Sequence, residues 1–222
     1  MMAILNNDWL YLLRLAWEIF APRRCAVCGR EIHNGIFCQV CREHFVLQKL
    51  LEQQEGLQAV HLLFKYTGQL RDCLRALKFQ RDTKYIRPLQ EEAELCMNAD
   101  GWQEFCCQYD VICPVPTAGS RRQQRGFDVP ELLFQFLPES KLRQVLRRVR
   151  NTASLYNLTG LDRRQELTGC FCCNGNVRGL RILLVDDIYT TGATAAEAAR
   201  TLAAGGAACV DMLAFSAGKN NF

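Results

Sequence analysis

Two adjacent carboxylates, Asp186 and Asp187, directly follow the short apolar run 181–185 (RILLV), and a hydroxyl-rich turn comes after them. An alanine-rich segment with helical character follows the turn. In an open α/β sheet, ligands bind at the carboxyl ends of the strands, where these two acids would lie. Free N–H groups at the start of the next helix would favour an anion there. The stretch therefore predicts a ligand site at the end of a buried strand.

The residues of the turn suit a phosphate group. Gly192 and Ala193 allow the backbone to approach a ligand closely, and three residues add hydroxyl donors: Thr190, Thr191 and Thr194. The carboxylates would repel a phosphate, but they suit sugar hydroxyls and a divalent cation such as Mg²⁺. A phosphorylated sugar satisfies both halves of the stretch. The alternative is an acidic strand end followed by an ordinary helix that a threonine caps.

Four cysteines near the N-terminus have the spacing of a metal site. The segment CAVCGREIHNGIFCQVC contains two C-x2-C pairs separated by nine residues: Cys25 and Cys28, then Cys38 and Cys41. Each pair can offer two thiolates, and four thiolates fill the tetrahedral coordination of a structural Zn²⁺ ion. The alternative is four free, buried cysteines. The other nine of the 13 cysteines lack this spacing, and we interpret them as small apolar residues rather than a second metal site.

Positive charge is concentrated in the middle of the chain. Residues 120–164 contain ten Lys or Arg and four Asp or Glu, a net charge of +6, whereas the whole chain carries +4. Such a surplus favours partners that bear phosphate, either small molecules or nucleic acid. A loop in this segment supplies Arg121, Arg122 and Arg125. These guanidinium groups would neutralise a pyrophosphate, or follow a nucleic-acid backbone with Phe127 stacked on a base; the alternative is a solvated basic loop.

The apolar segments predict the elements that would position these residues. Strands are expected over 61–66, 109–116, 181–185 and 208–215. Helices are expected over 68–79, 85–97, 128–138 and 194–206. Residues 117–126 read as a loop, and 142–150 as either a helix or a strand. The final strand, helix and strand predict a parallel unit, so the fold class is α/β.

The stretch VDDIYTTGATA resembles the ribose-phosphate-diphosphate (PRPP) binding motif of type I phosphoribosyltransferases. The resemblance implies that Asp186 and Asp187 hold the ribose 2′- and 3′-hydroxyls, with Mg²⁺ accompanying PRPP. It also implies that residues 190–194 wrap the 5′-phosphate. Tyr189 stands where an aliphatic residue is commoner. The implied fold is a phosphoribosyltransferase-like parallel sheet flanked by helices, here with a small N-terminal zinc finger.

Three features together resemble the ComF family of late competence proteins: the four-cysteine module, the central PVP…RRQQRGFD and the C-terminal VDDIYTTGAT. The segment YTGQLRDCLRALKF also matches, so the resemblance covers almost the whole chain. It implies a part in DNA uptake and natural transformation in bacteria. The chain differs from the family pattern at three polar places, where it has Asp128-Val129, Leu155 and Glu166.

We expect four parts: an amphipathic N-terminal helix over 1–22, the zinc finger over 23–45, a linker or short helix over 46–60, and a phosphoribosyltransferase-like domain over 61–222. No run of 18 apolar residues is present, so no membrane span is expected. The first 20 residues lack the basic start and the cleavage site of a signal peptide. Without an export signal, the many cysteines favour a cytoplasmic location.

Two hypotheses of function follow. In the first, the protein is a Mg²⁺-dependent phosphoribosyltransferase that uses PRPP; no residue stands out as its general base, so the catalytic residue is unknown. In the second, it is a non-catalytic protein that binds single-stranded DNA and competence or helicase proteins. The zinc finger and the basic segment 120–164 would then make these contacts. The absence of GxxxxGK[ST], and of GxGxxG after a strand, disfavours the P-loop and dinucleotide folds.

Overall fold

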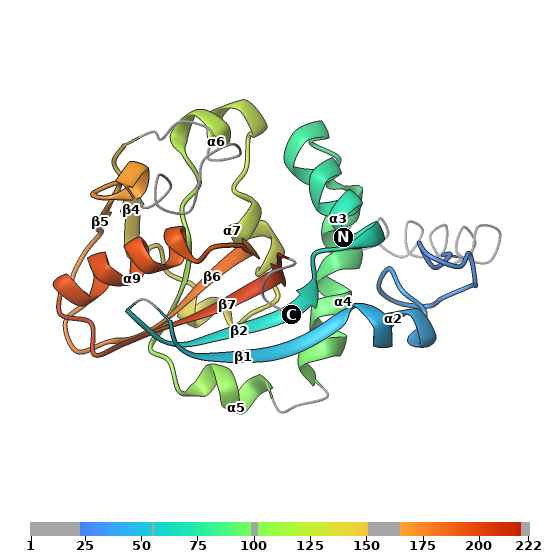
Figure 1. Cartoon of the computed structure of the whole chain (residues 1–222), viewed down its shortest axis with the longest axis horizontal. Helices are drawn as coiled ribbons and strands as arrows, with labels where there is room; N and C mark the ends of the chain where they lie inside the picture. The colour runs from blue at the N-terminus through green and yellow to red at the C-terminus, as the bar shows by residue number, and fades with distance from the viewer. Residues whose placement is uncertain (1–22, 55, 99–101, 151–164, 219–222) are drawn as a thin grey trace, which may run out of the picture.

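The computed structural model describes residues 23–54, 56–98, 102–150 and 165–218 (Figure 1). The helix expected over 1–22 lies outside these ranges, as does Leu155. No helix in the described ranges is long and apolar enough to cross a membrane.

A five-stranded sheet forms the centre of the molecule, in the order β1-β2-β7-β6-β3 (Figure 1). Its strands are β1 (Val46–Gln54), β2 (Leu57–Lys65), β3 (Val111–Pro114), β6 (Arg181–Tyr189) and β7 (Cys209–Ala217). Strands β2, β7, β6 and β3 run parallel to one another, and β1 is antiparallel to β2. The carboxyl ends of four strands therefore meet along one edge of the sheet. The predicted α/β class with a mostly parallel sheet is confirmed.

Helices flank the sheet, and two short strands form a separate pair (Figure 1). The helices are α2 (Gln39–Phe45), α3 (Gly68–Arg75), α4 (Ile86–Asn98), α5 (Trp102–Cys107), α6 (Gly119–Arg125), α7 (Val129–Leu133) and α9 (Ala193–Ala204). Three short helical segments are not α-helical. They are the π-helix η1 (Ala76–Gln80) and the 3₁₀-helices η2 (Thr83–Tyr85) and η3 (Glu139–Lys141). The antiparallel pair consists of β4 (Leu146–Arg148) and β5 (Phe171–Cys173).

The alternation of side chains along the strands builds a core on each face of the sheet. In β6, Leu183 and Val185 pack into one buried cluster with residues of α3, α4 and α7. Ile182 and Leu184 pack into the other cluster, with α9 and the β4–β5 pair. Because a strand buried on both faces needs apolar residues at every position, the continuous run RILLV was the clearest strand signal in the sequence.

The C-terminal unit confirms its prediction. β6 and β7 are parallel neighbours, and α9 connects them. β6 is longer than the expected run because Asp186 and Ile188 still pair with Ala214 and Ser216 of β7. The two aspartates therefore belong to the end of the strand itself, and the turn begins only after Tyr189.

Residues 46–60 were expected to be a linker or short helix, and this prediction is wrong. They form β1 and the first part of β2, joined as an antiparallel hairpin. β1 is the edge strand of the sheet and pairs only with β2. An edge strand needs no continuous apolar run, so its Gln-rich sequence resembled that of a loop.

Two further elements differ from their predictions. Residues 119–125 form α6 instead of a loop, with the N–H groups of Arg121 and Arg122 bonded to the carbonyl of Ala118. All residues of this helix except the half-buried Arg125 are exposed, so no apolar periodicity marked it. The helix expected over 128–138 is shorter and ends at Leu133. The ambiguous segment 142–150 contains strand β4.

A buried polar cluster ties the sheet together at the end opposite the aspartate pair. The Tyr109 hydroxyl donates to Asp211 Oδ2 at 2.8 Å, and the Ala59 N–H donates to Asp211 Oδ1 at 2.9 Å. Both Tyr109 and Asp211 are buried. Burial, followed by the hydrogen bond to Asp211, raises the pKa of Tyr109 far above its usual range. The cluster joins β2, β7 and the segment before β3.

Replacing Tyr109 with Phe should lower the free energy of unfolding by about 1–3 kcal/mol, because the buried Asp211 carboxylate loses a hydroxyl donor and keeps only the Ala59 N–H and the weaker Cys209 thiol. Urea unfolding followed by circular dichroism measures this difference. Tyr85→Phe is the control, because it removes a tyrosine hydroxyl outside the Asp211 cluster. Tyr85 is half-buried, and its ring, which the substitution keeps, contacts the exposed ammonium of Lys84. Equal stability of the Tyr109→Phe variant and the parent would contradict the assignment.

Candidate functional site

The acidic pair lies at the carboxyl edge of the sheet, as predicted. Asp187 is buried, and Asp186 keeps some contact with solvent. The Asp186 carboxylate accepts a hydrogen bond from the Asp187 N–H at 2.8 Å. Because successive residues of a strand point to opposite faces, the two carboxylates diverge and can act on different parts of a ligand.

Lys78 neutralises one of these acids. Its Nζ lies 2.7 Å from Asp187 Oδ1, and neither side chain of the pair is more than 17% exposed. Lys78 belongs to the π-helical turn η1, which continues α3, and the adjacent Leu77 is fully buried. π-Helical turns occur frequently at functional sites. We did not predict Lys78 as a site residue, although it lies in the Leu-Lys-Phe segment that carried part of the family resemblance.

The environment of Asp186 disfavours its charge. Protein atoms surround this carboxyl closely, and the resulting loss of solvation raises its pKa well above the usual value. The charge of Asp187 raises the pKa further, whereas Lys78 lowers it. The site therefore holds more negative charge than Lys78 alone compensates. A bound cation or a hydrogen-bond donor would relieve this excess.

The turn after β6 leads directly into a helix, as the sequence predicted. Gly192 has φ 76° and precedes α9, whose first residue is Ala193. A Cβ on Gly192 would lie only 2.4 Å from the Tyr189 hydroxyl, so both the dihedral angle and the space require glycine. Thr190 and Thr191 are exposed, and Thr194 is half-buried. All five residues predicted for the phosphate thus lie in one turn at the start of a twelve-residue helix.

The predicted arginines reach the same edge of the sheet because β3 runs parallel to β6. Asp128 is buried and accepts hydrogen bonds from the N–H and the Oγ1 hydroxyl of Thr117, at 3.0 and 2.6 Å. These bonds fix the segment that connects β3 to α6. One departure from the family pattern, Asp128, therefore has a clear structural role here.

One of the three predicted arginines, Arg125, interacts electrostatically with the acidic pair. Burial lowers the pKa of Arg125, and the charge of Asp187 opposes this shift while Arg121 adds to it. Arg122 instead lies 3.7 Å from Glu131 at the exposed surface of α6 and α7. Arg125 therefore interacts with the acidic pair electrostatically, with Arg121 as its neighbour.

A fourth arginine, Arg148, was not predicted as a site residue. It belongs to β4, and its guanidinium lies 5.3 Å from the centre of the Phe171 ring. Burial lowers the pKa of Arg148; Arg121 also lowers it, while Asp186 raises it. The short β4–β5 pair thus adds a guanidinium to the group around the acidic pair. The run of arginines over 147–150 was the signal in the sequence, but its periodicity did not show which one faces the site.

The four predicted cysteines lie together in an arrangement that is compatible with a metal site. Their Sγ atoms all lie within 4.8 Å of one another, and those of Cys28 and Cys38 are 3.6 Å apart. Zn–S bonds of about 2.3 Å in a tetrahedron place sulfurs about 3.8 Å apart, so the donor set fits one structural Zn²⁺. Zinc would fix the two C-x2-C turns of a module that is too small for a core of its own.

Two consecutive glutamates of α4 fasten this module to the rest of the protein. Glu92 is 1% exposed; it pairs with Arg42 and accepts hydrogen bonds from the N–H groups of Ile36 and Phe37. Glu91 pairs with Arg23 and accepts from the Gly35 N–H at 3.1 Å. The module is thus held through charged and backbone groups as well as through apolar packing.

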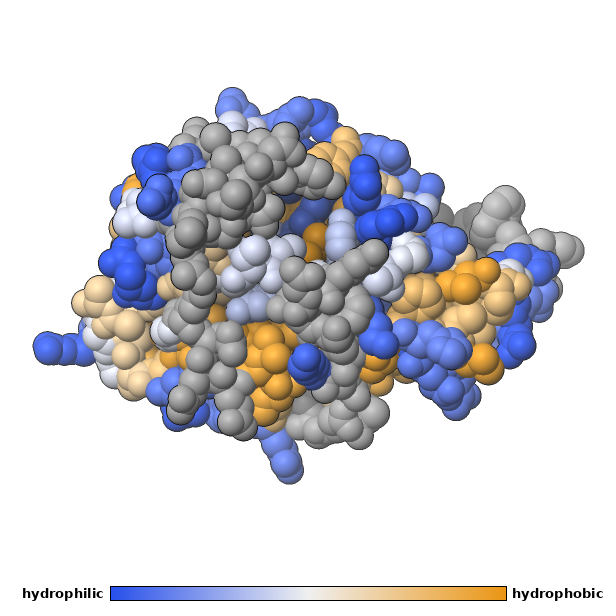
Figure 2. Space-filling model, viewed as in Figure 1, coloured by the Kyte–Doolittle hydropathy of each residue, from blue (hydrophilic) through white to orange (hydrophobic). Residues whose placement is uncertain are grey.

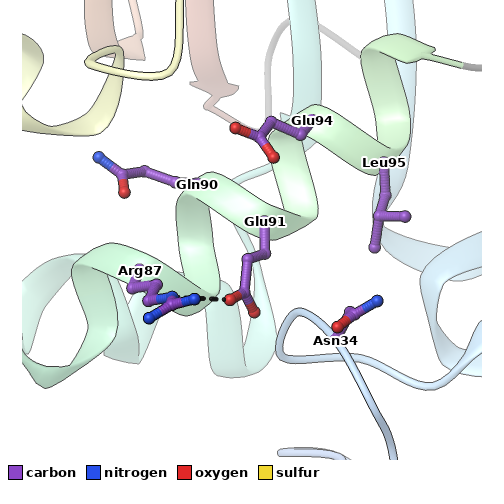
Figure 3. Close-up of a pocket in the computed structure, with 6 residues that line it drawn as sticks. All are labelled: Asn34, Arg87, Gln90, Glu91, Glu94 and Leu95. Atoms are coloured by element: carbon purple, nitrogen blue, oxygen red, sulfur yellow. Dashed lines mark hydrogen bonds and ion pairs between the residues drawn. The ribbon is translucent and has the colours of Figure 1, made fainter. Parts of the chain in front are cut away.

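A pocket of about 380 Å³ lies at this junction (Figure 3). In Figure 3 the Arg87 and Glu91 side chains form an ion pair on α4, and Asn34 of the cysteine module lies opposite. The lining is formed by Asn34, Arg87, Gln90, Glu91, Glu94 and Leu95. None of these residues belongs to the acidic site, so this pocket is a feature of the junction.

Together these features define an α/β protein with a mostly parallel sheet, an acidic pair at its carboxyl edge and an N-terminal four-cysteine centre. No protein-family model matches the chain. The chain is 29% identical to the DNA utilization protein YhgH of Salmonella typhimurium, over 96% of this chain and 97% of that protein. It is 26% identical to the competence protein ComFC of Bacillus subtilis, over 80% and 70% of the two chains.

A third relative is the competence protein F of Haemophilus influenzae, at 25% identity over 80% of this chain and 83% of that protein. These homologues support the assignment of the chain to the ComF family, as the sequence motifs predicted.

We expect the purified protein to contain about one Zn²⁺ per chain, and Cys38→Ser to reduce this content severalfold by removing a ligand from a closed tetrahedral set. Elemental analysis of gel-filtered protein measures the content. Cys107→Ser is the matched control, because Cys107 is exposed and lies outside the cluster. Parent protein without zinc, or equal metal content in the Cys38→Ser variant, would refute the metal centre.

Replacing Asp186 with Asn should stabilise the ligand-free protein at pH 8. A carboxyl whose pKa rises on folding costs stability above its folded pKa, and this cost disappears below the unfolded pKa of about 3.9. Thermal unfolding of parent and variant should therefore differ at pH 8 and converge toward pH 4.

Asp187→Asn is the comparison for this experiment. It removes the partner of Lys78 and should lower the stability at pH 8 by about 1 kcal/mol. If Asp186→Asn destabilises the protein as much as Asp187→Asn does, the described electrostatics of the pair are wrong.

Proposed function

We propose that the protein takes part in the uptake or use of DNA and that its acidic site binds PRPP or a related phosphorylated ribose. The names of the relatives, a DNA utilization protein and two competence proteins, support the first part of the proposal. The second part depends on one observation: two carboxylates end β6, and a glycine-containing turn joins them to the start of α9.

Each half of the site would bind one part of the ligand. Asp186 and Asp187 would accept hydrogen bonds from ribose hydroxyls, and a Mg²⁺ ion that accompanies the ligand would offset their charge. In the free protein, Lys78 already supplies one positive charge to Asp187. The 5′-phosphate would lie at the N–H groups and hydroxyls of residues 190–194, where the partial charge of the helix favours an anion.

The arginines suit the pyrophosphate part of PRPP. Arg125 and Arg148 interact electrostatically with Asp187 and Asp186, respectively, and Arg121 lies near both guanidinium groups. If phosphoribose is transferred, positive charge develops at the ribose C1′ atom and negative charge develops on the departing pyrophosphate. The acids and the arginines have the signs that stabilise these charges. This chemistry depends on position and electrostatics, and we assign no described residue as a general base.

Calorimetric titration with PRPP and Mg²⁺ tests the proposal. We expect the parent to bind, and the double variant Asp186→Asn/Asp187→Asn to bind at least tenfold more weakly, because it lacks both charges that attract the cation. Glu139→Gln, which removes an exposed carboxylate elsewhere, should bind like the parent. The proposal fails if the folded, zinc-loaded parent shows no heat of binding, or if all three proteins bind equally.

A further inference from the structure

A second basic segment begins in α3, which stands apart from α6 near the carboxyl ends of the strands (Figure 1). The segment 71–87, here called the basic arm, runs from α3 through η1 and η2 to the first turn of α4. It contains six Lys or Arg and two Asp, a net charge of +4, which equals that of the whole chain. Figure 2 shows strongly hydrophilic residues along the upper rim of this face, where α6 and the end of α3 project (Figure 1).

Several cations of the basic arm are available to a partner. Arg75 and Arg81 are exposed and have no ion-pair partner among the described residues. Within the described part of the chain, Arg71 and Lys84 form ion pairs only with the neighbouring exposed or half-buried acids Asp72 and Asp82, respectively. Such surface pairs contribute little to stability, and a phosphate could replace the acid in each of them.

An aromatic ring lies in line with these cations. Phe79 is 67% exposed, the highest value among the large hydrophobic residues that the structure describes. Arg71, Arg75 and Phe79 follow each other at intervals of four, on the exposed side of α3 and η1. The opposite side of the same segment consists of fully buried leucines: Leu70, Leu74 and Leu77.

The backbone of η1 is held in an unusual conformation. Its turn is π-helical, and Arg81, which ends it, has φ 57°, the only positive value of a non-glycine residue in the described ranges. A non-glycine residue in this region is uncommon and costs free energy, and such residues cluster at functional sites. Buried Leu77 and the Lys78–Asp187 ion pair hold the turn at the edge of the acidic site.

We propose that the basic arm binds single-stranded DNA, with Arg75 and Arg81 contacting phosphates and Phe79 stacking on a base. The positive charge complements the DNA backbone, and an exposed ring offers a stacking surface for any base. In a duplex the bases are already stacked, so an isolated phenylalanine gains access only to a single strand. The inference rests on the proposed role in DNA uptake. It assigns the contact to residues outside the cysteine module and the segment 120–164.

Fluorescence anisotropy with a labelled oligothymidylate of 20 nucleotides tests this inference on the full-length, zinc-loaded protein. We expect Phe79→Ala to weaken binding about tenfold and Phe79→Trp to restore it, since stacking needs only an aromatic face. Arg75→Gln should reduce the slope of log affinity against log salt by about 0.7, the value for one phosphate contact on a single strand. Arg178→Gln, at an exposed arginine before β6, is the charge-matched control.

The possible results separate this inference from the proposed function. Weaker binding by Phe79→Ala and Arg75→Gln, with Arg178→Gln unchanged, supports the basic arm as the contact. If the parent binds the oligonucleotide and all variants bind equally, or if the parent does not bind it, the inference is wrong. The PRPP titration is independent of either result, so the acidic site is judged on that measurement alone.

Discussion

Two neighbouring carboxylates at the end of a buried strand impose the main constraint on this structure. Asp186 and Asp187 lie where protein atoms limit hydration, so their charges must be compensated by nearby cations or by a ligand. The surrounding elements meet this requirement: η1 brings Lys78, β3 leads to the arginines of α6, and β4 brings Arg148. Parallel strand order makes this convergence feasible, since it collects the carboxyl ends of distant segments at one edge.

The parts that could be predicted from the sequence are those encoded by local patterns. The apolar run of β6, the alanine-rich α9 and β7 follow one another in the sequence. The two strands are buried along nearly their whole length, and α9 buries residues at helical spacing. The cysteine pairs were equally clear because C-x2-C is a turn that places two sulfurs together. Gly192 was also informative, since the turn requires both its positive φ and its lack of a Cβ.

The remaining parts depend on contacts that no local pattern records. Lys78 and Asp187 are 109 residues apart, and the pairing of β2 with β7 and of β7 with β6, together with the packing of α3, brings them close to each other. β4 has three residues, too few for a period, so the orientation of Arg148 could not be derived. β1 is polar because it is an edge strand, and this polarity concealed it among loop-like sequences.

Helix α4 has a consequence for how the chain can be divided. Its Glu91 and Glu92 accept hydrogen bonds from the cysteine module, while the side-chain amide of Gln90 donates to the Leu132 carbonyl of α7 at 2.6 Å. A truncated chain without the module would expose a carboxylate that the intact protein keeps 1% accessible. The module is therefore not an interchangeable attachment. Recombination that exchanged it for an unrelated finger would have to supply a new counterpart for Glu92 at the same time.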